Sequence, residues 1–261
     1  MSFNPFADVA TQVEGQKVAG EERDSLGGQQ LLPTNLYEVT ISNFFQHAFD
    51  SGAKYIVLEG VTSDGKKIKF QEVVSNKQGG VTYEKDGEKF FLPGYNKMNG
   101  IAMLASRKEL SGLEWEQKQV KLWSKAAGGE VLTPVPVAVN MIGKKVILGI
   151  LEQTVNQTQK NDTTNKYESI HAGDGVPLVK DENVIDKAFD VETKKTIPEL
   201  RAKAELPVFY KEWQEKYVGE GKGKVNRVKD KNLVLKKGGT GGNNTNAAGT
   251  QTAPPADNLF G

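Results

Sequence analysis

Apolar and polar residues alternate in three short segments of the first half of the chain, which is the pattern of half-buried β-strands. The segments are 36–41 (LYEVTI), 53–61 (AKYIVLEGV) and 66–74 (KKIKFQEVV). Asp64-Gly65 lies between the second and third segments and predicts a tight hairpin turn. Asp86-Gly87 separates VTYEK from EKFFL, so a second hairpin is predicted after the third strand.

The pattern changes after Pro93-Gly94, which ends the run of strands. Apolar residues at helical spacing predict a short helix over 96–110. Four further segments read as strands, and two read as helices, the second of them interrupted by Pro207. Pro134 and Pro136 predict that the second of these strands is an edge or irregular strand. These strands are 118–123, 131–140, 144–154 and 165–172, and the helices are 182–189 and 198–217.

This order of elements predicts a mainly β protein, built on a five-stranded barrel of the oligonucleotide/oligosaccharide-binding (OB) type. The hairpin is then an insertion after the third strand, and the short helices form a C-terminal extension. An SH3-like barrel or a β-sandwich also accommodates strands at this spacing. The helix between the third strand and the later strands favours the OB-type barrel.

The two ends of the chain differ in composition from its centre. Residues 1–34 are polar and glycine-rich, which is typical of a flexible arm. Residues 219–239 hold seven Lys or Arg against two acidic residues, and 238–261 are rich in Gly, Asn and Thr, so disorder is predicted there. The predicted parts are an arm (1–34), a binding domain (35–180), a helical extension (181–218) and a basic, then disordered tail (219–261).

Composition argues against several classes of function. The 261 residues carry a net charge of +1, so a nucleic-acid role would depend on local patches. There is no cysteine, and neither a P-loop nor a GxSxG motif occurs. His47 and His171 are far apart in the sequence, which gives no metal-ligand spacing. We therefore expect no enzyme activity, metal or cofactor.

The acidic residues of the strand region suggest no catalytic pair either. Asp50, Glu59, Asp64 and Glu72 lie at turns or alternating strand positions, where solvated carboxylates are usual. No apolar run has membrane-spanning length, and the N-terminus lacks the pattern of a signal peptide. A cytoplasmic protein without a membrane partner is expected.

Residues 75–100 mix aromatic residues with lysines, which suits neither a plain core segment nor a plain solvated loop. Binding of single-stranded nucleic acid needs both, because bases stack on aromatic faces while cations follow the phosphates. Strand alternation places Tyr55, Lys67 and Lys69 on one outer face. The candidate DNA-binding residues are Tyr55, Lys67, Lys69, Lys77, Tyr83, Lys85, Lys89, Phe90, Lys121, Trp123 and Tyr167. The aromatic residues predicted to lie in the core are Tyr37, Phe70, Phe91 and Trp213.

Several of these segments resemble single-stranded DNA-binding proteins of tailed bacteriophages. The resemblance rests on SGAKYIVLE, the TSDGKKI turn, SNKQGGVTYEKDGEKFFLPGYNKMNGIAML and IGKKVILGILEQTVN. It covers about residues 35–213 and implies an OB fold and sequence-tolerant binding of single-stranded DNA. It further implies work in phage DNA replication, recombination and repair, in the cytoplasm of the infected bacterial host.

The resemblance also implies a flexible tail that recruits phage or host replication, recombination or transcription proteins. Asp257, Leu259 and Phe260 are the candidate partner-binding residues. Such tails are commonly acidic, whereas Asp257 is the one charged side chain between 238 and 261. Two alternatives remain at this stage: a protein-binding module whose DNA affinity is secondary, and an enzyme such as a nuclease, against which the missing carboxylate cluster speaks.

Overall fold

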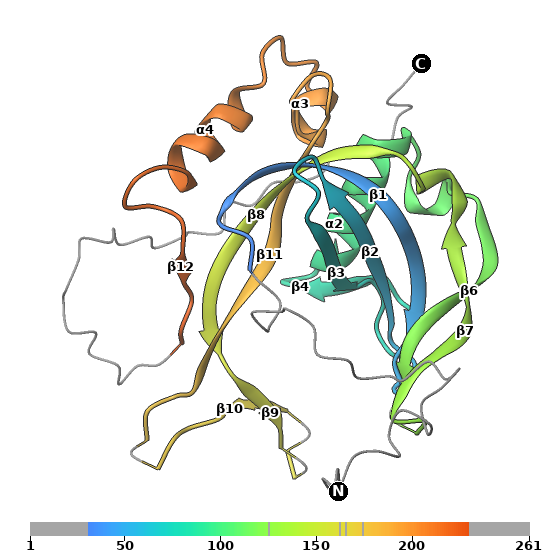
Figure 1. Cartoon of the computed structure of the whole chain (residues 1–261), viewed down its shortest axis with the longest axis vertical. Helices are drawn as coiled ribbons and strands as arrows, with labels where there is room; N and C mark the ends of the chain where they lie inside the picture. The colour runs from blue at the N-terminus through green and yellow to red at the C-terminus, as the bar shows by residue number, and fades with distance from the viewer. Residues whose placement is uncertain (1–30, 125, 162, 165, 174, 230–261) are drawn as a thin grey trace, which may run out of the picture. The chain divides into compact units, whose positions relative to one another are not determined.

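The computed structural model describes residues 31–229 except residues 125, 162, 165 and 174, and this part of the chain is mainly β (Figure 1). The prediction of a mainly β protein with few short helices is thus confirmed. The strands are β1 (Asn35–Ala48), β2 (Lys54–Thr62), β3 (Lys67–Val73), β4 (Thr82–Lys85), β5 (Glu88–Phe91), β6 (Trp115–Ser124), β7 (Gly129–Ala138), β8 (Lys145–Asn156), β9 (Thr158–Lys160), β10 (Tyr167–Ser169), β11 (Val179–Phe189) and β12 (Val225–Asn226). The helices are α2 (Pro93–Ser106), α3 (Ile197–Arg201) and α4 (Val208–Tyr217), with 3-10 turns at Leu110–Gly112 and Val139–Met141.

The largest sheet has the order β11-β8-β1-β2-β3, with antiparallel neighbours throughout. The hairpin of β6 and β7 joins this sheet where Phe45 of β1 pairs with Val137 of β7. The short β12 runs parallel to β8. Within the described residues β3 and β11 do not pair with each other, so they are the edges of this five-strand row and its closure into a barrel is not observed.

Strand β1 carries a bulge that changes which face its side chains occupy. Before the bulge, Val39 and Ile41 point into the main core, as the alternation predicts, and Tyr37 is partly buried against it. The register shifts between Ile41 and Asn43, and beyond it Phe44 lies in the main core while Phe45 faces a second, smaller cluster. One extra residue in a strand reverses the alternation after it.

The two Asp-Gly turns form as predicted. Gly65 adopts a φ of 83° in the turn between β2 and β3. Asp86 and Gly87 have φ values of 55° and 80° between β4 and β5, which are paired as a separate two-stranded hairpin. Asp-Gly suits such turns because Gly, and more rarely Asp, tolerates positive φ. The inserted hairpin after the third strand is confirmed.

Helix α2 covers the main core and contacts β3, β8 and β11. It begins at Pro93, earlier than the predicted start at residue 96, because proline at the first helical position lacks only an N–H that the helix would leave unpaired. Met98, Ile101 and Leu104 are buried on its inner side. Gly94 lets the first turn lie against β3, because a Cβ at this position would be 2.2 Å from the backbone oxygen of Val73.

Replacing Gly94 with alanine should therefore destabilise the domain by about 1–3 kcal/mol, as overpacking of a tight contact does. The obstacle is backbone, which cannot turn aside as a side chain can. Chemical denaturation followed by circular dichroism would measure the change. Gly100 to alanine is the control in the same helix, because a Cβ there meets no atom within 4 Å. An equal stability of the two variants would contradict this packing argument.

Strand β8 is buried on both faces. Val146, Leu148 and Ile150 lie in the main core, while Ile147 and Leu151 meet a third cluster under α4. Trp213 of α4 is buried in that cluster, as predicted for this residue, and its indole N–H donates to Asp186 Oδ2 at 2.8 Å. Gly149 makes room for it, because a Cβ there would be 2.9 Å from the Trp213 ring.

The predicted helix over 182–189 is wrong, because this segment is strand β11, paired with β8. The apolar residues Val184, Ile185, Ala188 and Phe189 have spacings that suit a helix. The register shift between Ile185 and Lys187 produces this spacing in a strand, because the bulge interrupts the two-residue period. Pairing with β8 therefore makes this segment a strand, although its local pattern favours a helix.

The predicted helical stretch 198–217 forms as two helices, α3 and α4, with the break before Pro207 as expected. Thr196 caps α3, and Glu199 completes the capping box by accepting from the Thr196 backbone N–H at 2.8 Å. The other carboxylate oxygen of Glu199 accepts from Phe209 N at 2.9 Å, which ties the start of α4 to α3.

The β6–β7 hairpin contains both prolines of the sequence 131–140. Pro134 and Pro136 pair across from Gln119 and Gln117 of β6. On its other side β7 pairs with β1 at Val137 alone, so the prolines lie where β7 is an edge strand. The prediction of an edge strand is confirmed for this part of β7.

Both ends of the described chain are attached to the paired strands β8 and β11. Asn183 accepts from Leu32 N and donates to Leu32 O, both at 2.7 Å, which fixes the end of the predicted N-terminal arm. Thr34 Oγ1 accepts from Glu152 N at 2.9 Å. Lys224, at the start of the predicted basic tail, pairs with Asp181 at 2.5 Å and Glu152 at 3.6 Å. The rest of the predicted arm (1–34) and tail (219–261), residues 1–30 and 230–261, lies outside the described residues.

Candidate functional site

The outer face of β2 and β3 carries the first group of predicted site residues. Tyr55 pairs across from Val73, while Lys69 and Lys67 lie opposite Glu59 and Val61. Since residues two apart in a strand share a face, Tyr55, Lys69 and Lys67 are on the same side of the sheet, away from Ile56 and Leu58 in the core. The predicted shared face is confirmed by this register.

The β6–β7 hairpin covers part of this outer face. Phe45 and Val57 from the sheet pack with Val135 and Val137 from β7 in a small buried cluster. Tyr55 lies at the border of the cluster, together with Val120 and Leu122 of β6. The hairpin is therefore fixed on the sheet by an apolar contact, and its free end extends beside Tyr55.

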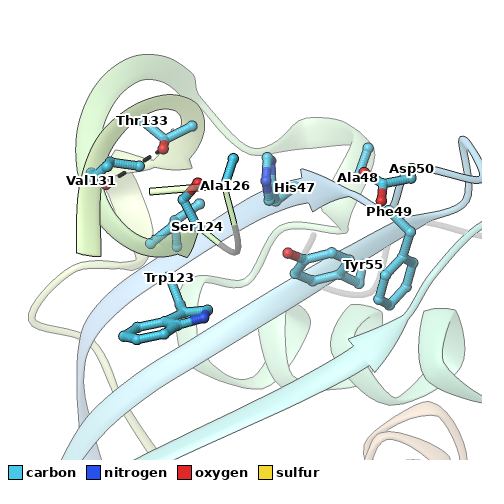
Figure 2. A pocket seen from close by; sticks show the side chains of 11 residues that line it. His47, Ala48, Phe49, Asp50, Tyr55, Trp123, Ser124, Ala126, Val131 and Thr133 are labelled. Carbon is cyan, nitrogen blue, oxygen red and sulfur yellow. Dashed lines mark hydrogen bonds between the residues drawn. The ribbon is translucent and has the colours of Figure 1, made fainter. Parts of the chain in front are cut away.

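A pocket of about 750 Å³ lies at this border (Figure 2), and below it is called the aromatic pocket. Figure 2 shows Phe49, Asp50 and Tyr55 toward one end and Trp123 and Val131 toward the other. The pocket combines the end of β1, the turn after it, β2 and the tip of the β6–β7 hairpin. Its lining residues are His47, Ala48, Phe49, Asp50, Tyr55, Leu122, Trp123, Ser124, Ala126, Val131 and Thr133.

The rings of the aromatic pocket are partly packed and partly open to solvent. The Phe49 and Tyr55 ring centroids are 4.5 Å apart, and the His47 ring meets Tyr55 edge-on at 5.6 Å. Trp123 is 71% exposed, which is unusual for the largest apolar side chain. Burial raises the pKa of the Tyr55 phenol. An exposed indole and a fixed phenol ring provide surfaces on which a planar group can stack.

Sequence reasoning placed Tyr55 and Trp123 among the candidates and the structure brings these two together. It missed Phe49 and did not include His47 among the candidates. The sequence signal that could have identified Phe49 is its position directly before the turn residues Asp50-Ser51-Gly52. A residue directly before such a turn lies at the end of the sheet.

The predicted site lysines differ in how far they are neutralised. Lys69 pairs with Glu59 at 2.9 Å, so its charge is partly compensated. Within the part of the chain that the structure describes, five other predicted lysines form no ion pair with an acidic side chain. They are Lys67, Lys77, Lys85, Lys89 and Lys121. These ammonium groups remain available to an anion.

The inserted hairpin divides its predicted residues between two faces. Tyr83 and Phe90 pair across the hairpin, with ring centroids 5.8 Å apart, and Lys85 shares their face by alternation. Lys89 belongs to the opposite face. Phe91 is also on that face and is 47% exposed, so its predicted core position is wrong. It stacks instead on Tyr95 at the start of α2, at 5.0 Å between centroids.

The remaining predicted residues lie on two other hairpins. Lys121 is two residues before Trp123 in β6 and shares its face by alternation. Tyr167 is on β10 and is 74% exposed, in the hairpin with β9 that extends beyond the β8–β11 ladder (Figure 1). Tyr167 thus belongs to a different hairpin from the aromatic pocket. The candidate partner-binding residues Asp257, Leu259 and Phe260 lie outside the described residues.

The described residues hold no group of three or more His, Asp or Glu side chains that could bind a metal ion. None of their helices is long and apolar enough to cross a lipid bilayer. Of the four acidic residues considered above, three are paired with lysines, as Glu59 with Lys69, Asp64 with Lys66 and Glu72 with Lys97.

Comparison with protein-family models gives no match to this chain, and comparison with curated proteins gives none either.

Proposed function

We propose that the protein is a non-catalytic single-stranded DNA-binding protein that coats and protects single strands in phage DNA replication, recombination and repair. The observation that carries the proposal is the aromatic pocket, where exposed Trp123 and fixed Tyr55 lie beside a lysine-bearing sheet face. Proteins that bind single strands without sequence readout use stacking faces together with cations along the backbone. The pocket offers the stacking faces, and Lys67, Lys77 and Lys121 offer the cations.

The strand order supports an OB-type architecture. With β1, β2, β3, β8 and β11 taken as the five barrel strands, the third and fifth are the two edges of the row. A barrel closes when these two edges approach, and α2 contacts both β3 and β11. The OB fold is a partly open five-stranded barrel that binds oligonucleotides on its second and third strands and on the loops after the first and fourth.

In an OB-type architecture, some of the candidate residues would occupy those positions. Phe49 and Asp50 lie in the turn after the first barrel strand, and Tyr55, Lys67 and Lys69 lie on the second and third. Tyr167 lies in the connection between the fourth and fifth, the segment that contains β9 and β10.

The biological setting of the proposal comes from the resemblance to tailed-phage proteins. It comprises the cytoplasm of an infected bacterial host and recruitment of replication, recombination or transcription proteins through the C-terminal residues Asp257, Leu259 and Phe260. The second candidate, a protein-binding module whose DNA affinity is secondary, is distinguished by the experiment below.

Fluorescence anisotropy of labelled oligo-dT and of a duplex of equal length, titrated at several salt concentrations, tests the proposal. We expect the single strand to bind more tightly than the duplex, because only unpaired bases can stack on the pocket. Three phosphate contacts would weaken single-strand binding roughly 20-fold between about 50 and about 200 mM salt.

A full-length variant with Lys231, Lys236 and Lys237 changed to alanine is the matched control, because these residues carry charge in the basic segment outside the described fold. The natural protein could bind single strand and duplex equally, and this variant could lose that binding. That result would place the activity in the basic segment. An absence of any DNA binding would reject the proposed function and favour the protein-binding module.

A further inference from the structure

We propose that the aromatic pocket receives one unpaired base of the bound strand and favours guanine through the carboxylate of Asp50. The inference rests on the proposed function, and it adds a base preference that general stacking does not supply. It starts from Asp50, the one acidic side chain among the residues that line the pocket.

Asp50 differs from Glu59, Asp64 and Glu72 in having no partner. Glu59 accepts from Lys69 at 2.9 Å and Asp64 from Lys66 at 3.1 Å, and Glu72 is likewise paired with Lys97. Over the described ranges, the Asp50 carboxylate has neither an ion pair nor a hydrogen bond. A carboxylate without a cation at a DNA-binding surface repels phosphates and so weakens binding. Hydrogen bonds that it accepts from the ligand can offset this cost.

The turn between β1 and β2 fixes the place of Asp50. Gly52 N donates to Phe49 O at 2.9 Å, and Phe49 N donates to Ala53 O at 2.9 Å. Gly52 has a φ of 85°, which suits glycine in a tight turn. The turn holds Asp50 at the end of the pocket beside Phe49 and Tyr55, as Figure 2 shows. A base stacked against these rings would present its edge to the same region.

The chemistry of the base edges decides which base the carboxylate favours. An ionised carboxylate only accepts hydrogen bonds, and two parallel N–H donors match its two oxygens. Guanine presents N1–H and the 2-amino group side by side on its Watson–Crick edge. Cytosine and adenine offer an amino group beside an acceptor nitrogen. Thymine has a single N–H between two carbonyl oxygens, which a carboxylate repels. The expected order is therefore guanine first and thymine last.

The test uses the full-length protein and oligo-dT in which each position in turn is replaced by one guanine. Binding is measured by anisotropy at constant salt. We expect at least one position at which guanine improves affinity about tenfold, the size of a good bidentate contact to a base. Hypoxanthine at that position, which lacks the 2-amino group, should lose most of the gain.

Asp50→Asn separates recognition of the base from simple repulsion. This variant should bind oligo-dT more tightly than the natural protein, because a negative charge is removed, and should lose the preference for guanine. Asp64→Asn is the matched control, since Asp64 lies in the next turn of the same sheet and is paired with Lys66. It should keep the guanine preference.

The outcomes distinguish this inference from the function on which it rests. If single strands bind through Tyr55 and Trp123 but guanine and thymine bind equally, the base preference is rejected and the proposed function stands. A guanine preference that persists in Asp50→Asn also rejects the role of Asp50. If no single strand binds the natural protein, both proposals fail.

Discussion

Replacing Tyr55 and Trp123 together with alanine is expected to weaken oligo-dT binding at least about 30-fold, because each base-stacking contact contributes roughly 1–3 kcal/mol. The 30-fold loss corresponds to two lost stacking contacts, each at the lower end of this energy range. The two rings line the same pocket, and Trp123 is already exposed, so its removal costs little packing. Anisotropy at constant salt measures the effect.

Conservative variants test whether the aromatic rings themselves are required for binding. Tyr55→Phe with Trp123→Phe retains two rings and should keep most of the affinity, whereas the alanine pair loses it. Leu206→Ala, at another strongly exposed apolar residue between α3 and α4, should leave binding unchanged. If the alanine pair bound oligo-dT as tightly as the natural protein, the aromatic pocket would not be the binding site.

Loss of the Asp190 carboxylate is expected to destabilise the domain by about 1–3 kcal/mol, the cost of leaving the donors to a buried acceptor unsatisfied. Asp190 is 1% exposed and pairs with Arg107 at 2.5 Å. Its Oδ1 also accepts from the backbone N–H groups of Glu192 and Thr193, at 3.1 and 2.8 Å. Asp190→Asn would remove the carboxylate with which the Arg107 guanidinium pairs. Urea denaturation at neutral pH measures the loss.

The same carboxylate predicts a pH dependence. Burial alone would raise the pKa of Asp190, but the Thr193 N–H and the Arg107 guanidinium outweigh it and hold this pKa below its usual value. A carboxyl with a lowered folded-state pKa contributes its full stabilisation above the unfolded pKa of about 3.9 and loses it as the pH falls through the folded value. The stability difference between the natural protein and Asp190→Asn should therefore shrink below about pH 4.

Glu114→Gln is the control for this effect. Glu114 pairs with Lys108 at 2.8 Å, but both side chains are largely exposed, and such surface pairs contribute little. This variant should unfold at the same urea concentration as the natural protein. A stability difference between Asp190→Asn and the natural protein that stayed constant down to pH 3 would contradict the assignment of the acid sensitivity to Asp190.

Local patterns predicted most of the strands and both hairpin turns. Alternation identified the core face of β2 and β3, because a strand with one buried face must place apolar residues at every second position. Asp64-Gly65 and Asp86-Gly87 located the turns, because positive φ restricts the choice of residue. The helix start at Pro93 was missed by three residues, since Pro-Gly was interpreted only as a break.

The errors in the sequence interpretation arise where distant pairing overrides the local pattern. The segment 182–189 has helical spacing only because β11 contains a bulge, and pairing with β8 makes it a strand. Phe91 looked like a core residue, yet the hairpin that carries it forms a sheet of its own, and the ring stacks on Tyr95 near the surface. Neither outcome is encoded within a window of neighbouring residues.

The sequence by itself determined the mainly β character, the two hairpins and the shared face of Tyr55, Lys67 and Lys69. These follow from periods and turn residues a few positions apart. Only the tertiary structure decided that Phe49, Tyr55 and Trp123 line one pocket and that Asp50 stands there without a cation. The β1 bulge and the contact of Phe45 with β7 bring those segments together. Strand registers between distant segments depend on how the whole core packs, and no local pattern specifies them.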